Sequence, residues 1–191
     1  MIINYMFKNN LNQSNTNNNK IITFIGMMGT GKSKFGRLIA KNLNFFFYDT
    51  DILIEKKFNT TIKNLFQENG EDFFRKAEEK MIKELIFNLL QSNQNSIISV
   101  GGGAFDNLNT RTVLLKNSLV IWLNTPVETL INRVGDGAKR PMIKGNVKNS
   151  ISKLLKKRIH YYSLCHNQLN TGKLNQNQII EEITKLISNM K

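Results

Sequence analysis

A phosphate-binding pattern lies near the beginning of the chain. Residues 26–33 read GMMGTGKS and match G-x-x-x-x-G-K-S. Glycines allow backbone N–H groups to turn inward around phosphates, Lys32 can reach the β and γ oxygens of a nucleotide, and the Ser33 hydroxyl can bind Mg²⁺. The predicted ligands are therefore a nucleoside triphosphate and Mg²⁺, and the predicted chemistry is transfer of a phosphoryl group.

The segments on either side give this pattern its structural context. Residues 20–25 form an apolar run that predicts a buried strand, and residues 32–43 have the periodicity of a helix. The N-terminus of that helix would direct its positive dipole end at the phosphates. A strand, a glycine-rich turn and a helix in this order favour a nucleotide site over a chance match.

Two carboxylates, Asp49 and Asp51, follow the predicted second strand at residues 45–48. Ligands of open α/β sheets bind at the carboxyl ends of the strands, so one carboxylate can face Mg²⁺ while the other meets a substrate hydroxyl. Asp51 could also cap the helix predicted over residues 51–58, because aspartate is a favoured N-cap residue. The two roles are compatible.

A glycine triplet and an arginine add possible substrate contacts. Gly101, Gly102 and Gly103 follow the predicted third strand. Without side chains they would let a ligand approach their backbone N–H groups, although such a triplet is also typical of a simple turn. Arg75 lies in a predicted helix, where its guanidinium fork can bind a carboxylate and Glu78 can orient it.

Short apolar runs alternate with longer segments of helical periodicity, which predicts βαβ units and a parallel sheet. The predicted strands are residues 20–25, 45–48, 97–100, 119–123 and 168–170. The predicted helices are residues 32–43, 51–58, 62–68, 71–91, 108–116, 126–134, 150–164 and 178–190, with Pro126 at a helix start. The predicted fold class is α/β, a three-layer α/β/α kinase fold with a five-stranded parallel sheet.

Residues 135–148, GDGAKRPMIKGNVK, interrupt this alternation. The segment is rich in glycine and charge, has no apolar period and lies between two predicted helices. A surface connection would explain it. A mobile lid explains its length and cations better, because phosphoryl transfer requires that water be excluded from the reacting groups.

The composition indicates one domain of a protein kept in a reducing compartment. The chain has 191 residues, 40% of them hydrophobic, and its one cysteine, Cys165, excludes an internal disulfide. Residues 1–19 are polar and rich in asparagine, which predicts a disordered leader and neither a secretory signal nor a transit peptide. No apolar run approaches the length of about 18 residues that spans a bilayer. The expected organisation is one domain over residues 20–191, located in the cytoplasm without membrane contact.

The net charge of +13 raises the question of nucleic-acid binding. The lysines are spread over every predicted helix, and no zinc-finger spacing or aromatic-plus-basic strand accompanies them. The abundance of Lys, Asn and Ile is also typical of a biased genome composition. We therefore expect no nucleic-acid partner, and interpret the charge as favouring anionic small molecules.

Six motifs taken together resemble those of the shikimate kinase family. They are the phosphate-binding loop, DTD at 49–51, GEDFFRKAE at 70–78, GGG at 101–103, KRP at 139–141 and residues 158–162, in nearly the expected order and spacing over residues 20–187. The resemblance implies a P-loop kinase that transfers the γ-phosphoryl group of ATP to the 3-hydroxyl of shikimate, in aromatic amino-acid biosynthesis. It also implies Mg²⁺ as the cofactor, a monomer, and a substrate-binding region at about residues 51–80.

The resemblance assigns a role to each matching residue. Lys32 would bind the β and γ phosphates, Asp51 would assist deprotonation of the acceptor hydroxyl, and Arg140 would move with the lid onto the phosphates, which makes these three catalytic. The expected shikimate contacts are Asp51, Arg75, Gly101, Gly102, Gly103 and Arg158. The expected ATP contacts are Gly29, Thr30, Gly31, Lys32, Ser33, Lys34, Arg133 and Arg140. The expected metal contacts are Ser33 and, through water, Asp49.

The chain departs from the family pattern at several positions. It has RPMI where RPLL is usual, Lys34 where threonine is common, and HYY at residues 160–162 where Pro-Leu-Tyr often follows the arginine. Residues 170–176, expected to surround the adenine, contain no proline and offer only Thr171 as a landmark. No adenine contact is assigned there.

Three other functions are compatible with parts of the sequence. Gluconate kinases and nucleoside monophosphate kinases share the phosphate-binding loop, but they do not predict the DTD, GEDFFR and GGG motifs together. A regulatory protein that binds nucleotide without catalysis is disfavoured by the intact Lys32, Asp51 and Arg75. A nucleic-acid binder would show a steep salt dependence of duplex binding.

Overall fold

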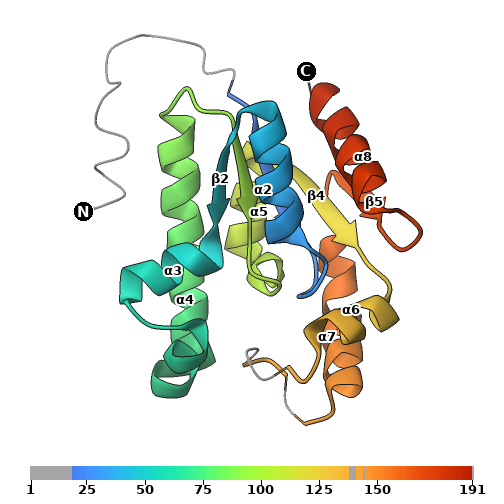
Figure 1. Ribbon diagram of the computed structural model, residues 1–191. Coiled ribbons are helices and arrows are strands. Elements are labelled where there is room, and N and C mark those ends of the chain that lie inside the picture. The colour runs from blue at the N-terminus through green and yellow to red at the C-terminus, as the bar shows by residue number, and fades with distance from the viewer. Residues whose placement is uncertain (1–18, 138–140, 144, 191) are drawn as a thin grey trace.

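A five-stranded parallel sheet forms the centre of the protein in the computed structural model (Figure 1), which describes residues 19–137, 141–143 and 145–190. The strand order is β2-β3-β1-β4-β5. The strands are β1 (Ile21–Ile25), β2 (Phe46–Asp49), β3 (Ser96–Ser99), β4 (Leu119–Asn124) and β5 (Asn167–Asn170). Each lies within one residue of its predicted position, and the predicted α/β fold class is confirmed.

The helices also follow the periodicity of the sequence closely. They are α2 (Lys32–Leu43), α3 (Thr50–Phe58), α4 (Ile62–Leu90), η1 (Ala104–Asp106), α5 (Leu108–Asn117), α6 (Val127–Val134), α7 (Val147–Tyr162) and α8 (Gln176–Ser188). The start of α7 lies three residues before its predicted start, inside the predicted lid, because the Asn146 side chain caps the helix by accepting from Asn149 N at 3.0 Å.

Helices cover both faces of the sheet, which makes the three layers (Figure 1). On one face, Ile22 and Phe24 of β1 pack with α2 and α8. On the other face, Ile21 and Ile25 of the same strand pack with α4, α5 and α7. Because both faces are buried, the strand reads as a continuous apolar run and not as an alternating one.

The strand register brings the three sequence motifs to one edge of the sheet. Phe24 of β1 pairs with Ser99 of β3, and Asp49 of β2 pairs with the same Ser99. The phosphate-binding loop, the DTD motif and the glycine triplet therefore leave neighbouring strands at the same level. This is the carboxyl edge, where ligands of parallel α/β sheets bind.

The predicted break between the helices at 62–68 and 71–91 is present as a kink inside α4 at Gly70, whose φ of 81° and ψ of 172° are not helical. Two other local predictions differ from the structure. The N-cap of α3 is Asp49 and not Asp51, because Asp49 Oδ1 accepts from Asp51 N at 3.1 Å. Pro126 is the N-cap of α6 and not its first helical residue, with an extended ψ of 143°. The short η1 turn was not predicted.

The two ends of the described chain meet the core through polar contacts. Of the predicted leader, only Asn19 is among the described residues, and its Nδ2 donates to Leu89 O at 2.7 Å. Lys20 Nζ donates to Ile187 O and Met190 O, each at 3.3 Å, where it complements the negative end of α8. Across the described residues, no helix is both long and apolar enough to cross a membrane.

Candidate active site

The phosphate-binding loop adopts the turn that its glycines permit. Gly29 and Gly31 have φ values of 82° and 93°, in the left-handed region that side chains disfavour. Thr30 Oγ1 donates to Met27 O at 2.9 Å, which closes the turn. Lys32 is 9% exposed and its Nζ donates to Met27 O at 3.0 Å and to Gly26 O at 2.8 Å. Thr30 and Lys32 are thus held in place by hydrogen bonds within the loop itself.

An oxygen-rich group lies directly beside the loop. Ser33 Oγ donates to Asp49 Oδ2 at 2.5 Å and lies 3.3 Å from Ser99 Oγ. Hydroxyl and carboxylate oxygens are the ligands that Mg²⁺ prefers, and Mg²⁺ in kinases is bound by few protein groups together with substrate phosphates and water. Among the described residues, no group of three or more His, Cys, Asp or Glu is placed so that it could hold a metal ion. The donor set fits Mg²⁺ bound with a nucleotide.

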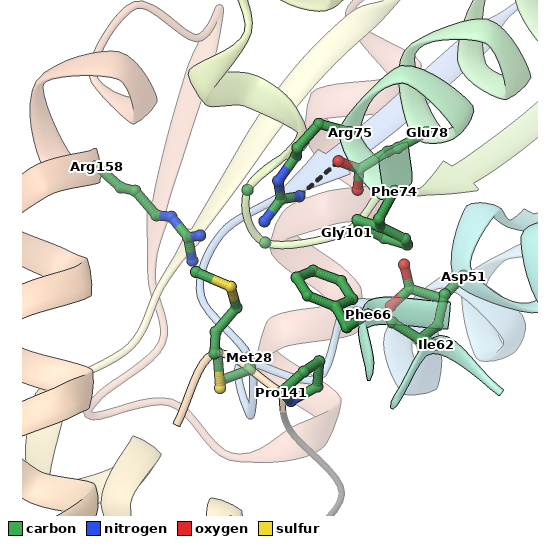
Figure 2. A pocket seen from close by; sticks show the side chains of 13 residues that line it. Met28, Asp51, Ile62, Phe66, Phe74, Arg75, Glu78, Gly101, Pro141 and Arg158 are labelled. Carbon is green, nitrogen blue, oxygen red and sulfur yellow. Dashed lines mark hydrogen bonds and ion pairs between the residues drawn. The ribbon is translucent and has the colours of Figure 1, made fainter. Parts of the chain in front are cut away.

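A pocket opens next to this group at the carboxyl edge of the sheet (Figure 2). Its lining combines apolar side chains from the loop, α4 and the predicted lid with polar groups from α3, α4, the glycine triplet and α7. The lining residues are Met28, Asp51, Ile62, Phe66, Phe74, Arg75, Glu78, Gly101, Gly102, Gly103, Pro141, Met142 and Arg158. All six residues predicted to contact shikimate therefore line this pocket.

Two arginines from distant parts of the chain converge on Gly103. A Cβ atom at that position would lie 2.6 Å from Arg75 Nη2 and 2.8 Å from Arg158 Nη2. Figure 2 shows the two guanidinium groups on opposite sides of the glycine loop, turned toward one another. Two cationic forks at this spacing suit a carboxylate between them.

Arg75 is oriented by Glu78, as the sequence predicted. Arg75 Nη1 donates to Glu78 Oε2 at 2.6 Å, and Glu71 adds a longer contact at 3.4 Å. Glu78 is 2% exposed, and burial together with the nearby Asp51 carboxylate raises its pKa to about 7 against the opposing effect of Arg75 and Arg158. Among the described residues, Glu78 Oε1 has no hydrogen-bond partner.

The absence of a side chain at Gly101 is explained by this carboxylate. A Cβ atom there would collide with Glu78 Oε1 and would lie 3.0 Å from Asp51 Oδ1. Gly101 N also donates to Thr50 Oγ1 at 3.3 Å, which joins the triplet to the start of α3. The glycine therefore allows the carboxylates of α3 and α4 to approach the triplet closely.

Glu78 gives the folded protein a pH dependence that can be measured. Its folded pKa of about 7 lies above the ordinary value of 4.5 for a glutamate, so the native state binds more protons than the unfolded state between these values. Stability should therefore fall as pH rises through this window. Between pH 5 and pH 8 this contribution amounts to about 2 to 3 kcal/mol.

The Glu78→Gln variant should lack this contribution. Relative to the wild type, the variant should therefore gain stability as pH rises, its free energy of unfolding increasing by about 2 to 3 kcal/mol from pH 5 to pH 8. Urea denaturation of both proteins at the two pH values measures it. Parallel pH dependences in the two proteins would contradict the raised pKa.

The remaining predicted nucleotide residues lie as follows. Arg133 Nη1 donates to Gly29 O at 3.2 Å, which places this arginine beside the phosphate-binding loop. Lys34 is exposed, and its Nζ lies 5.7 Å from the centroid of the Phe35 ring. Arg140 lies outside the described residues. Its neighbour Pro141 lines the pocket.

Several residues of the site have only weak signals in the sequence. Phe66 and Phe74 form an aromatic pair with centroids 4.6 Å apart at the pocket wall, yet in the sequence they read as ordinary core positions. The Tyr162 hydroxyl donates to Gly102 O at 2.5 Å, and burial raises its pKa, so it remains a donor. Asp106 forms an ion pair with Arg158, but in the sequence its only marker is the glycine triplet that precedes it.

The fold and the site define the class of the protein. A phosphate-binding loop, a Ser33–Asp49 group suited to Mg²⁺ and an adjacent pocket with a carboxylate and two arginines belong to a P-loop kinase that acts on a small molecule.

Comparisons with known proteins give the particular family. The family model described as shikimate kinase matches residues 28–188. A shikimate kinase of Clostridium botulinum is 42% identical over 174 residues, 90% of this chain and 98% of that protein. One of Sulfurihydrogenibium is 35% identical over 164 residues, 86% of this chain and 95% of that protein.

A solved structure agrees with these sequences. The structure of shikimate kinase from Acinetobacter baumannii in complex with shikimate has a TM-score of 0.83 and 30% identity, covering 92% of this chain and 97% of that one. The chain belongs to the shikimate kinase family, and it is an enzyme that phosphorylates an alcohol group.

Proposed function

We propose that this protein transfers the γ-phosphoryl group of ATP to the 3-hydroxyl of shikimate. The observation that carries the proposal is the convergence of Arg75 and Arg158 on Gly103, opposite a pocket wall that bears Asp51. Shikimate has one carboxylate and three hydroxyls, which are the groups that two arginines and an aspartate recognise. Gluconate kinase and nucleoside kinases would not require this combination.

The acceptor is oriented by the polar ends of this pocket. The carboxylate of shikimate binds between Arg75 and Arg158, and the backbone of Gly101, Gly102 and Gly103 bounds the same side. Asp51 accepts the 3-hydroxyl proton as the hydroxyl oxygen attacks the γ-phosphorus. The bond from the γ-phosphorus to the bridging oxygen breaks, and ADP leaves with the electron pair.

The nucleotide binds on the other side of the reacting groups. Lys32 stabilises the charge of the β and γ phosphates, and backbone N–H groups of residues 29–34 surround them. Mg²⁺, when bound, would neutralise charge that develops on these phosphates, and Ser33 and Asp49 are the residues that would hold it. Arg133 lies beside the loop and extends the nucleotide site.

The predicted lid completes the proposed site. We assign it to residues 135–148, of which Pro141 and Met142 line the pocket. Arg140 would approach the transferred phosphoryl group when the lid closes. The wider organisation stays a proposal as well: a catalytic domain over residues 20–191, a substrate-binding region at about 51–80, and a monomer in the cytoplasm.

A coupled ADP-release assay tests the proposed reaction. The full-length protein is supplied with Mg²⁺ and ATP, and with shikimate, gluconate or AMP as the acceptor. We expect turnover with shikimate alone, dependent on the divalent metal, and a product that carries phosphate on the 3-oxygen. Turnover with gluconate or AMP in place of shikimate would contradict the proposal, and ATP binding without any turnover would favour a non-catalytic nucleotide binder.

A further inference from the structure

The charge of Arg158 is almost completely inside the protein. Its side chain is 2% exposed, in the second half of α7 and next to the glycine triplet. Desolvation of an ionised group at such depth costs several kcal/mol unless a partner compensates it. The group that compensates this charge therefore also determines the orientation of the guanidinium.

The charged partner is Asp106, while Arg158 Nη1 also donates to Met27 Sδ at 3.9 Å. Asp106 Oδ2 accepts from Arg158 Nε at 3.0 Å. This contact uses the inner edge of the guanidinium and leaves Nη1 and Nη2 at the glycine loop, where Nη2 is 2.8 Å from the Cβ position of Gly103. Figure 2 shows the outer end of Arg158 turned toward that loop and toward Arg75.

The turn that carries Asp106 is itself held on both sides. Arg111 Nη1 donates to Phe105 O at 2.9 Å and to Asp106 O at 3.1 Å. Asp106 N donates to Gly103 O at 3.1 Å. The Arg111 guanidinium also lies 4.7 Å from the centroid of the Tyr161 ring, which links the turn to α7. Asp106 is thus a fixed support and not a mobile surface carboxylate.

Folding alone gives a poor account of an aspartate at this position. Asp106 Oδ1 is buried and has no hydrogen-bond partner in the described part of the chain. An unsatisfied buried oxygen reduces stability, and its presence therefore calls for another reason. The orientation of Arg158 provides one.

We propose that Asp106 is a positioning residue for recognition of the substrate carboxylate. It holds Arg158 by Nε so that Nη1 and Nη2 face the carboxylate opposite Arg75. Glu78 holds Arg75 through a different nitrogen, accepting from Nη1 at 2.6 Å, so each arginine of the pair has its own orienting carboxylate. Because both forks are set before substrate binds, less side-chain entropy is lost on binding. The inference rests on the proposed function.

Two substitutions in the full chain separate orientation from charge. Asp106→Ala removes the acceptor for Nε, and we expect KM for shikimate to rise about tenfold or more with KM for ATP unchanged. Asp106→Asn keeps an acceptor oxygen, and we expect KM for shikimate to stay within about threefold of the wild-type value. Glu181→Ala, which removes an exposed carboxylate from α8, away from the substrate-binding region, is the control.

A second measurement tests whether the carboxylate of shikimate is the group recognised. The methyl ester of shikimate lacks the negative charge, so the wild type should bind shikimate more tightly than the ester in calorimetry, and Asp106→Ala should lose most of that preference. In the Arg158→Lys background, Asp106→Ala should add little further loss. Should the alanine variant fail to fold, Asp106→Ser, whose hydroxyl is too short to reach Nε, replaces it, with thermal melting as the check.

Three results would overturn the inference. The first is an unchanged KM for shikimate in Asp106→Ala and Asp106→Ser while Arg158→Lys raises it. The second is an equal increase in KM for shikimate and for ATP in the Asp106 variants. The third is an equal increase in KM for shikimate in the alanine and asparagine variants. Failure of the proposed function would be seen separately, because the wild type would then not phosphorylate shikimate.

Discussion

Replacing Asp51 with asparagine should lower kcat for shikimate phosphorylation by about 10²- to 10⁴-fold, the usual range for removal of a general base. Asp51 lines the pocket and stands at the start of α3, where its backbone N–H is fixed by Asp49 Oδ1 at 3.1 Å. Asparagine has nearly the same shape, so the helix cap and the pocket should persist. The amide cannot accept the hydroxyl proton, so the loss should appear mainly in kcat.

The measurement is steady-state ADP release with shikimate and ATP each varied. KM for shikimate should rise modestly, since the amide oxygen can still accept a hydrogen bond from the substrate hydroxyl, and KM for ATP should stay the same. Glu181→Gln makes the same change from carboxylate to amide at an exposed position of α8 and should leave kcat unchanged. A kcat within about threefold of the wild type in Asp51→Asn would exclude Asp51 as the proton acceptor.

The sequence predicted the parts of the site that depend on local patterns. Buried parallel strands are continuous apolar runs, so β1 was located within one residue and the register then placed its loop beside Asp49 and Gly101. The phosphate-binding loop, Asp51 and the glycine triplet each follow the carboxyl end of a strand within a few residues. Such motifs can be read without the fold, because the edge of a parallel sheet brings them together.

Contacts made across long separations could not be read in this way. Asp106 and Arg158 are 52 residues apart, and nothing in the sequence around either indicates that the turn after the glycine triplet supports a side chain of α7. The raised pKa of Glu78 depends on its depth and on the proximity of Asp51, both set by the packing of α4.

Gly103→Ala should raise KM for shikimate about 100-fold, which corresponds to the loss of two charge-assisted hydrogen bonds at about 1.5 kcal/mol each. Gly103 has φ of −101° and ψ of −5°, which alanine adopts without strain, so the backbone need not change. The new methyl carbon would lie 2.6 Å from Arg75 Nη2 and 2.8 Å from Arg158 Nη2. Both guanidinium groups would have to move away from the carboxylate.

The neighbouring glycine provides the contrast. A Cβ atom at Gly102 would lie at least 3.4 Å from its nearest neighbours, including Arg158 Nη1 at 3.6 Å, so Gly102→Ala should raise KM for shikimate less than about tenfold. Both variants should keep the KM for ATP, which binds on the other side of the loop, and melting temperatures would show that both are folded. Equal effects of the two substitutions would mean that the triplet acts through its backbone alone. A large effect confined to Gly103 would show that the space between the two arginines, and not the flexibility of the glycines, is what the substrate carboxylate requires.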